Sequence, residues 1–284
     1  MTRGEINDAT WRDRLQRAGL CDPVALLHDP PDERLAGRWE ILTKPGLGGR
    51  ERWRWQADGP DDVVLYVKRY LHTPLPQQLD RVRRQTVRHS RAWWEYRVSL
   101  ELAQRCISAV RAVAFAEWMR GPYEVRSAVL FERAAGDAFD RVWPGIRDGR
   151  APLTRGRPRH ELVRALARFV SAFHQTGLCH RDLYLCHVFA DLDPAAQRPP
   201  QFMLIDLARL HRPRWRRLRW IVKDLAQLDC SAQQIGATRA DRLRFLTAYL
   251  GLELNSPRVR YYARRIVRKS RQILDRIARR SGRP

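Results

Sequence analysis

One stretch constrains what this chain can fold into more than any other: Cys179-His180-Arg181-Asp182-Leu183-Tyr184-Leu185-Cys186-His187. It follows a segment with helically spaced apolar residues, and a second acidic signal, Leu204-Ile205-Asp206-Leu207, comes after it. A strand that ends in an aspartate about two dozen residues after an H-R-D turn is typical of a phosphoryl-transfer site. In such a site the first aspartate can accept a hydroxyl proton, and the second can hold Mg²⁺ against the phosphates of ATP. We therefore expect the fold to bring Asp182 and Asp206 together.

The charge of the chain is its second unusual property. The formal net charge is +23 and the isoelectric point is about 11.1. From His211 onward, Lys and Arg exceed Asp and Glu by about fifteen, so most of the excess lies in the last quarter of the chain. The charge indicates an anionic partner: nucleic acid, an acidic membrane surface or a phosphorylated glycan. A GC-rich coding sequence that favours arginine explains the composition equally well.

Length and composition bound the class of protein. The 284 residues suffice for one two-lobed domain or two small ones. The five cysteines are scattered without a CxxC pair, which favours reduced thiols over disulfides or a zinc site. No window of ~18 residues is uninterruptedly apolar, and residues 1–19 lack the apolar core of a signal peptide. We expect a cytoplasmic protein with no transmembrane helix.

The first half of the chain predicts an antiparallel sheet with one main helix. Residues 1–37 are expected to be an N-terminal extension, with a helix at Thr10–Ala18 followed by a linker that contains proline and aspartate. Residues 38–133 contain five strand-like segments. A glycine-rich turn with Gly46, Gly48 and Gly49 joins the first two strands, and its backbone N–H groups could lie over phosphates. A simple hairpin turn is the alternative.

Two charged residues in this half are candidates for nucleotide binding. Lys68 ends the strongest strand signal, Val63–Tyr70, where its amine could reach the α- and β-phosphates. Glu95 lies early in a predicted helix over Arg88–Gln104 and could hold Lys68 in place. The alternatives are an edge-strand lysine with its amine in water and a solvated glutamate on a helix surface. Glu132 would begin a connector whose backbone could face an adenine base.

The second half, residues 134–284, predicts a mostly helical lobe. Residues 137–159 are rich in loop-forming residues. Helices are expected at Arg159–Thr176, Ile221–Leu228, Arg239–Leu250 and Pro257–Arg280, with Gly251 ending the third. The last of these is amphipathic and basic. We expect it to dock on the lobe and to present its basic face to a membrane; a helix lying in the membrane surface is the alternative.

The order of these signals resembles the protein-kinase-like fold. More specifically, H-R-D-L-Y-L-C-H-V-F, L-I-D-L-A-R-L and R-W-I-V-K-D-L-A-Q-L resemble the lipopolysaccharide core kinase (Kdo/WaaP) family. The resemblance covers about residues 38–250. It implies an α+β, two-lobed fold and an enzyme that uses ATP and Mg²⁺ to phosphorylate a heptose or Kdo hydroxyl. The lipid-linked, anionic core glycan would be the substrate, at the inner face of the inner membrane.

The resemblance also assigns residue roles. It implies that Asp182 is the catalytic base and Asp206 a Mg²⁺ ligand, that Lys68 binds phosphate and that Glu95 anchors it. His187 stands where protein kinases have asparagine, so it is either a second metal ligand or a structural histidine. Asp224 is implied to brace the H-R-D turn through its backbone.

Two other functions remain open. Leu207 and Ala208 replace the last two residues of D-F-G, and no A-P-E element follows, which argues against a regulated protein kinase. A kinase for proteins or small molecules is one alternative. The other is a noncatalytic protein on a kinase scaffold that binds nucleic acid or membranes; intact Lys68, Asp182 and Asp206 argue against it and against a nucleic-acid partner. The sequence does not identify a protein partner.

Overall fold

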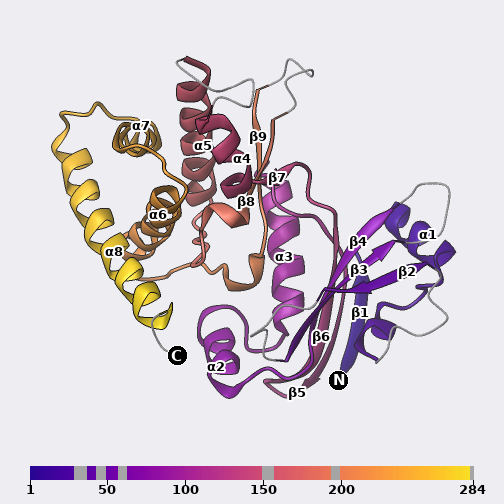
Figure 1. The fold of residues 1–284 in the computed structure, drawn as a ribbon. Helices are drawn as coiled ribbons and strands as arrows, with labels where there is room; N and C mark the ends of the chain where they lie inside the picture. Colours follow the sequence, from indigo (N-terminus) through magenta and orange to yellow (C-terminus); the bar gives the residue numbers. More distant parts are fainter. Residues whose placement is uncertain (29–36, 43–48, 57–62, 149–156, 193–198, 282–284) are drawn as a thin grey trace. The chain divides into compact units, whose positions relative to one another are not determined.

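The computed structural model describes residues 1–28, 37–42, 49–56, 63–148, 157–192 and 199–281. The chain divides into two compact units, Met1–Arg133 and Ala134–Pro284. The first unit contains a large antiparallel sheet and the second is mostly helical (Figure 1). The α+β content predicted from the sequence is confirmed.

The first unit is built on a six-stranded antiparallel sheet with the order β1-β5-β6-β4-β3-β2. Its strands are β1 (Thr2–Ile6), β2 (Arg38–Ile41), β3 (Arg50–Gln56), β4 (Val64–Tyr70), β5 (Ala112–Arg120) and β6 (Tyr123–Glu132). The five strands expected in residues 38–133 are present as β2 to β6, and the sheet has a sixth strand that was not expected, because β1 adds to the edge of β5. β1 is largely polar and only Ile6 in it is buried, so its sequence lacks the alternation typical of strands.

The two faces of β4 have different neighbours, because successive side chains of a strand point to opposite faces. On one face, Leu65 and Val67 pack in a buried cluster with residues of α1 (Ala9–Arg17) and η1 (Pro23–Leu27). From the same face, Nη2 of Arg69 donates to the carbonyl of His28 at 2.9 Å. Lys68 belongs to the opposite face, which α3 (Arg91–Gln104) covers. The N-terminal segment and α3 therefore enclose the sheet between them.

Helix α3 is tied to the sheet at two points, at its start and near its middle. The hydroxyl of Ser90 caps its first turn by accepting from the N–H of Trp93 at 3.1 Å. The N–H of Ser90 in turn donates to Glu117 of β5 at 2.7 Å. Further along the helix, the hydroxyl of Ser99 accepts from the N–H of Ala112 at 2.9 Å. α3 begins three residues later than predicted, and a separate helix, α2 (Leu75–Arg84), precedes it.

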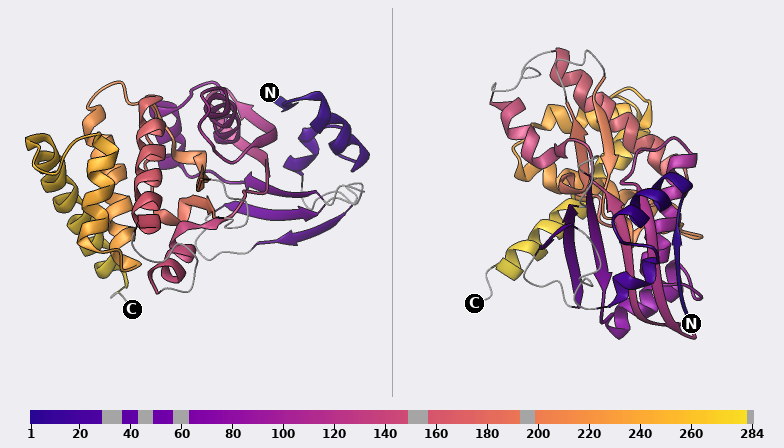
Figure 2. Two further views of the ribbon diagram at one scale, coloured as in Figure 1. Left: turned by 90° about the horizontal axis from the view of Figure 1, so that it is seen from above. Right: turned by 90° about the vertical axis from the view of Figure 1, so that its right-hand side faces the viewer.

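The second unit contains five helices and a small sheet among the residues that the structure describes. They are β7 (Asp137–Ala138), α4 (Phe139–Arg147), α5 (Arg157–Gln175), η2 (Leu185–His187), β8 (Val188–Asp191), β9 (Gln201–Leu204), η3 (Leu207–Arg209), α6 (Arg217–Gln234), α7 (Arg239–Leu250) and α8 (Pro257–Ser281). Helix α4 replaces part of the predicted loop, with Trp143 and Ile146 buried. α6 packs along α8, as Figure 2 shows, and α5 packs on α7. α7 ends at Gly251 as predicted.

Helix α8 is long, but its sequence is basic along its whole length. Within the described ranges, no helix combines the length and the apolar character that crossing a membrane requires.

Candidate functional site

In the first unit, Lys68 and Glu95 form a buried ion pair. Nζ of Lys68 lies 3.1 Å from Oε2 of Glu95, and the two side chains are 9% and 0% exposed. The hydroxyl of Tyr70 donates to the other carboxylate oxygen of Glu95. Nζ also lies 5.5 Å from the centre of the Tyr70 ring. The carboxylate is thus held from two sides, and it fixes the position of the lysine ammonium group.

These contacts exclude the two alternatives that the sequence left open. β4 is an interior strand, paired with β3 on one side and β6 on the other, so Lys68 is not an edge-strand lysine. Glu95 is fully buried, so it is not a solvated helix charge. A buried ion pair contributes little net stability compared with apolar side chains of the same size. The expense of burying this pair therefore favours a functional role for it.

The glycine-rich turn is only partly within the described residues. Gly46 and Gly48 lie outside them. Gly49 has φ +71°, and a Cβ there would stand 2.4 Å from the carbonyl oxygen of His72. Its own carbonyl accepts from the N–H of Leu71 at 2.8 Å. The close backbone approach explains why glycine is needed at 49, and phosphate binding by this turn stays a prediction.

Glu132 lies at the end of β6 and its side chain is engaged inside the first unit. One carboxylate oxygen accepts from Nε1 of Trp11 at 2.9 Å and lies 3.4 Å from the guanidinium of Arg111. The backbone N–H of Glu132 donates to the carbonyl of Arg111 at 2.9 Å. A contact between this segment and an adenine base stays a prediction.

In the second unit, a buried carboxylate holds the backbone of the H-R-D turn. The two oxygens of Asp224 accept from the N–H groups of His180 at 2.7 Å and Arg181 at 2.8 Å. Arg181 has φ +70°, a left-handed conformation that is unfavourable for a side chain larger than glycine's. These two hydrogen bonds stabilise that strained turn. The bracing role expected of Asp224 is confirmed.

The environment of Asp224 keeps it ionised. Burial alone would raise the pKa of Asp224, but hydrogen bonds from His174 and from the His180 N–H outweigh it and lower the pKa. His174, Cys179 and Asp224 place ligand atoms within 4.8 Å of one another. Because burial raises the pKa of the Cys179 thiol, and both Asp224 oxygens already accept backbone N–H groups, this cluster is structural.

His187 connects the two predicted catalytic aspartates. Its Nδ1 donates to the carbonyl oxygen of Asp182 at 2.7 Å, and its Nε2 lies 3.8 Å from Oδ2 of Asp206. The β8–β9 hairpin brings these residues together, because His187 precedes β8 and Asp206 follows β9 closely. Asp206 is left-handed, with φ +56°. Asp182 and Asp206 therefore lie on one side of the second unit, joined through one imidazole.

The donor set fits Mg²⁺ at Asp206. Carboxylate oxygens are the ligands that Mg²⁺ prefers, and the Asp206 side chain is 22% exposed, so its oxygens are accessible. His187 fits less well. Burial lowers its pKa, but a hydrogen bond with Cys186 and the charge of Asp206 prevail and raise it to about 9. A protonated imidazole is a partner for the carboxylate, and ligation of a second metal ion by His187 stays a prediction.

Two cationic side chains that were not predicted from the sequence lie beside Asp182. Nη1 of Arg209 contacts both carboxylate oxygens of Asp182, at 3.0 and 2.8 Å. The amine of Lys223 donates to the carbonyl of Arg181, and burial lowers the pKa of Lys223 to about 8. Both residues lie in the sequence blocks that resemble the family: Arg209 is three residues after Asp206, and Lys223 directly precedes Asp224. Their position in those blocks is the feature of the sequence from which they could have been predicted as site residues.

A cavity of about 520 Å³ lies elsewhere in the second unit. Aromatic and aliphatic side chains of α4 to α8 form most of its lining, including Trp143, Leu166, Phe245 and Ile266. Asp182 and Asp206 are not among the lining residues, so this cavity is separate from the two aspartates.

Comparisons with known proteins agree with this arrangement. Residues 54–249 match the Lipopolysaccharide kinase (Kdo/WaaP) family. The chain is 34% identical over 156 residues to the lipopolysaccharide core heptose(I) kinase WaaP of Pseudomonas aeruginosa, which is 55% of this chain and 58% of that protein. It is 36% identical over 101 residues to the Escherichia coli K12 protein of the same name, covering 34% and 37% of the two chains. The chain thus matches less than two thirds of the length of these relatives.

A solved structure described as WaaP in complex with acyl carrier protein is similar over almost the whole chain. The TM-score is 0.61 at 24% identity, covering 98% of this chain and 97% of that one. The likeness shows the fold and confirms the kinase-like architecture predicted from the sequence. The family match spans more than half of the chain and includes Lys68, Glu95, Asp182 and Asp206. The chain therefore belongs to the Lipopolysaccharide kinase (Kdo/WaaP) family.

Proposed function

We propose that this protein transfers the γ-phosphoryl group of ATP to a sugar hydroxyl of the lipopolysaccharide inner core. The observation that carries the proposal is the set of acidic and basic groups inside the family match. A buried ion pair fixes a lysine ammonium in one unit, and two accessible aspartates share one histidine in the other. Phosphoryl transfer depends mainly on positioning and on charge stabilisation, and these are the groups it needs.

Each side chain has a distinct part in the proposed reaction. The ammonium group of Lys68 binds the α- and β-phosphates, and Glu95 keeps it from turning away. A carboxylate oxygen of Asp182 accepts the proton of the attacking sugar hydroxyl. Asp206 holds Mg²⁺, which when bound neutralises charge on the β- and γ-phosphates. His187 orients both aspartates, one through its backbone carbonyl and one through its side chain.

The substrate is proposed to be a heptose rather than Kdo. Two similar proteins carry the name lipopolysaccharide core heptose(I) kinase, which favours a heptose as the acceptor. An inner-core glycan is anionic, so a chain with a net charge of +23 would attract it. The same charge supports contact with an anionic membrane surface, where a lipid-linked glycan would be found.

An acyl carrier protein is a proposed partner. The similar solved structure is that of WaaP in complex with acyl carrier protein, and the likeness covers almost the whole chain. Size-exclusion chromatography of the two purified proteins, separately and mixed, tests this. Elution of the mixture as two independent peaks would contradict it.

The transferase activity is tested with purified protein, Mg-ATP and core lipopolysaccharide from a strain that lacks the phosphate on its first heptose. Mass spectrometry of the released glycan should show one added phosphate, and fragmentation should place it on that heptose. Phosphate on Kdo would correct the acceptor and keep the reaction class. Labelling of a protein substrate with no transfer to glycan would replace the proposal with a protein kinase.

A further inference from the structure

Helix α2 has its polar residues inside and its leucines outside. Leu75 and Leu79, one turn apart, are 73% and 66% exposed, and Val87 just beyond the helix is 51% exposed. On the other side of the helix, Gln78 is 6% exposed and Arg81 is fully buried. A surface helix of a globular protein normally has the opposite arrangement, with apolar residues toward the core.

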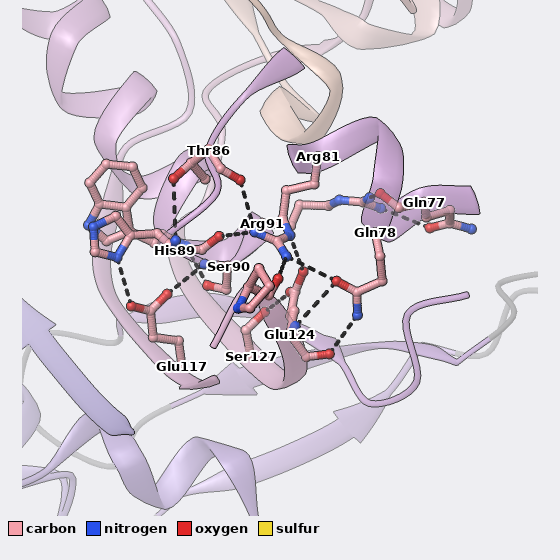
Figure 3. Close-up of polar contacts among 12 residues, drawn as sticks. Gln77, Gln78, Arg81, Thr86, His89, Ser90, Arg91, Glu117, Glu124 and Ser127 are labelled. Carbon is pink, nitrogen blue, oxygen red and sulfur yellow. Dashed lines mark hydrogen bonds and ion pairs between the residues drawn. The ribbon is translucent and has the colours of Figure 1, made fainter. Parts of the chain in front are cut away.

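A buried polar network fixes this orientation (Figure 3). The guanidinium of Arg81 donates to the carbonyls of Thr86 at 2.9 Å and of Pro122, and lies 3.4 Å from the carboxylate of Glu124. The amide of Gln78 donates to the carbonyl of Glu124 at 2.7 Å and accepts from its N–H at 3.2 Å. The β5–β6 turn therefore holds the inner face of α2 through specific hydrogen bonds.

This network prevents the helix from burying its leucines. Turning α2 about its axis would remove the partners of Arg81 and would take away one of the two cations, Arg81 and Arg91, that act on the buried carboxylate of Glu124. Leaving a buried charge uncompensated is among the most destabilising changes in a protein. Scattered exposed leucines are ordinary, but here a costly buried network maintains the exposure of an apolar stripe. The fold thus presents Leu75 and Leu79 to solvent in a fixed orientation.

The charges next to this apolar face suit an anionic lipid surface. Arg83 and Arg88 are exposed, and Arg84 is about one third exposed and paired with Asp80. An apolar stripe flanked by arginines is the pattern of helices that lie in a membrane interface, where apolar burial adds to attraction by anionic headgroups. The net charge of +23 adds long-range attraction to the same kind of surface.

We propose that α2 and the segment up to Arg88 form a membrane-docking element that inserts Leu75, Leu79 and Val87 among anionic lipids. The inference deepens the proposed function, because an enzyme that acts on a lipid-linked glycan must work at a lipid surface. It also predicts that docking is separable from catalysis, since these side chains have no part in the proposed chemistry.

Vesicle binding tests this directly. The full chain is mixed with vesicles of phosphatidylglycerol and phosphatidylethanolamine, or of phosphatidylcholine alone, and the bound fraction is measured by flotation. Wild type should bind the anionic vesicles. The variant Leu75→Gln/Leu79→Gln should bind them at least tenfold more weakly, and the loss should persist at high salt, where contacts by arginines alone are screened.

A matched control is Ile41→Gln/Leu254→Gln, which removes two aliphatic side chains that are 61% and 57% exposed outside the element. It should bind vesicles like wild type. The unfolding temperature of each variant should stay close to that of wild type, because the replaced side chains are exposed. Equal vesicle binding by wild type and the α2 variant would overturn the proposal. A change from dimer to monomer in the α2 variant, with unchanged vesicle binding, would overturn it and assign the face to a second copy of the chain.

Activity then separates this proposal from the proposed function. The α2 variant should phosphorylate a soluble, deacylated core glycan at the wild-type rate and vesicle-embedded lipopolysaccharide at a rate at least tenfold lower. Vesicle binding without transfer to either substrate would reject the kinase function and leave the docking element supported.

Discussion

The two units hold the charged side chains of the candidate site in opposite ways. In the first unit, Lys68 and Glu95 are almost completely buried. Their positions are fixed by contacts with other side chains, namely their own ion pair and the hydrogen bond from Tyr70 to Glu95. In the second unit, the Asp182 and Asp206 carboxylates are 24% and 22% exposed. There the buried charge is Asp224, which holds the backbone, while the two candidate catalytic carboxylates stay accessible. Rigidity comes from side chains in one unit and from main-chain hydrogen bonds in the other.

The difference fits the roles proposed for these groups. A lysine that binds phosphate has to keep one position, and a buried carboxylate achieves that at the expense of desolvation. An aspartate that accepts a proton or binds a metal ion has to meet a substrate, so its oxygens must be reachable. The left-handed residues Arg181 and Asp206 turn the chain sharply and place those carboxylates at the surface. Replacing Lys68 should therefore lower both stability and activity, whereas replacing Asp206 should lower activity with little change in stability.

The largest effect on activity is expected from Asp206→Ala. The variant should lose at least about 10³-fold in kcat, since it removes the proposed metal ligand. Its unfolding temperature should change little, because the carboxylate is partly exposed. Steady-state kinetics with Mg-ATP and core glycan measure the first quantity, and thermal unfolding the second. Asp275→Ala, which removes an exposed carboxylate from α8, is the matched control and should keep wild-type activity.

Lys68→Ala should reduce both activity and stability, unlike Asp206→Ala. We expect a rate about 10²–10⁴-fold lower, because an ammonium group that stabilises phosphate charge is lost. The free energy of unfolding should fall by roughly 3–5 kcal/mol, because Glu95 stays buried without its cation. The double variant Lys68→Met/Glu95→Gln should recover much of the stability and none of the activity. Recovery of activity in the double variant would contradict the assigned role of the lysine.

Asp224→Asn tests the main-chain bracing in the second unit. The free energy of unfolding at neutral pH should fall by roughly 3 kcal/mol, because two backbone N–H groups lose a charged acceptor. The folded-state pKa of Asp224 is lowered, so its contribution is fully present above about pH 4 and is lost as pH falls through the folded-state value. The stability difference between wild type and Asp224→Asn should therefore shrink with acidification. Urea unfolding at several pH values measures it, and a constant difference would contradict the assignment.

The sequence predicted those parts of the fold in which local pattern and burial agree. The apolar run at Val63–Tyr70 identified β4, and the H-R-D and L-I-D blocks identified the turns that carry Asp182 and Asp206. The Lys68–Glu95 ion pair was expected because a strand lysine and a helix glutamate occur in that order. These elements could be predicted because the residues that determine them are close together in the sequence or belong to a known motif.

Other parts depend on partners that are distant along the chain. α2 was missed because hydrophobic periodicity locates the core side of a helix, and here that side is polar. β1 was missed because pairing with β5, more than a hundred residues away, makes it a strand. Arg209 meets Asp182 only because a left-handed turn at Asp206 redirects the chain. Conformation and long-range pairing decide these three cases, and neither is visible in local composition.

The smallest effect is expected at Arg209, the accessible counterpart of the buried lysine. Both hydrogen bonds to Asp182 come from Nη1, and we expect the other nitrogen atoms of the guanidinium to bind an anionic acceptor. Arg209→Gln should change the free energy of unfolding by less than about 1 kcal/mol, because the arginine side chain is 49% exposed. It should raise KM for the glycan by roughly tenfold and leave kcat within a few fold. The KM of Arg209→Lys for the glycan should lie between those of wild type and Arg209→Gln. A rise in kcat for Arg209→Gln would show instead that Arg209 obstructs Asp182. The Asp182 carboxylate would then be restrained by its arginine partner, although it is accessible to solvent.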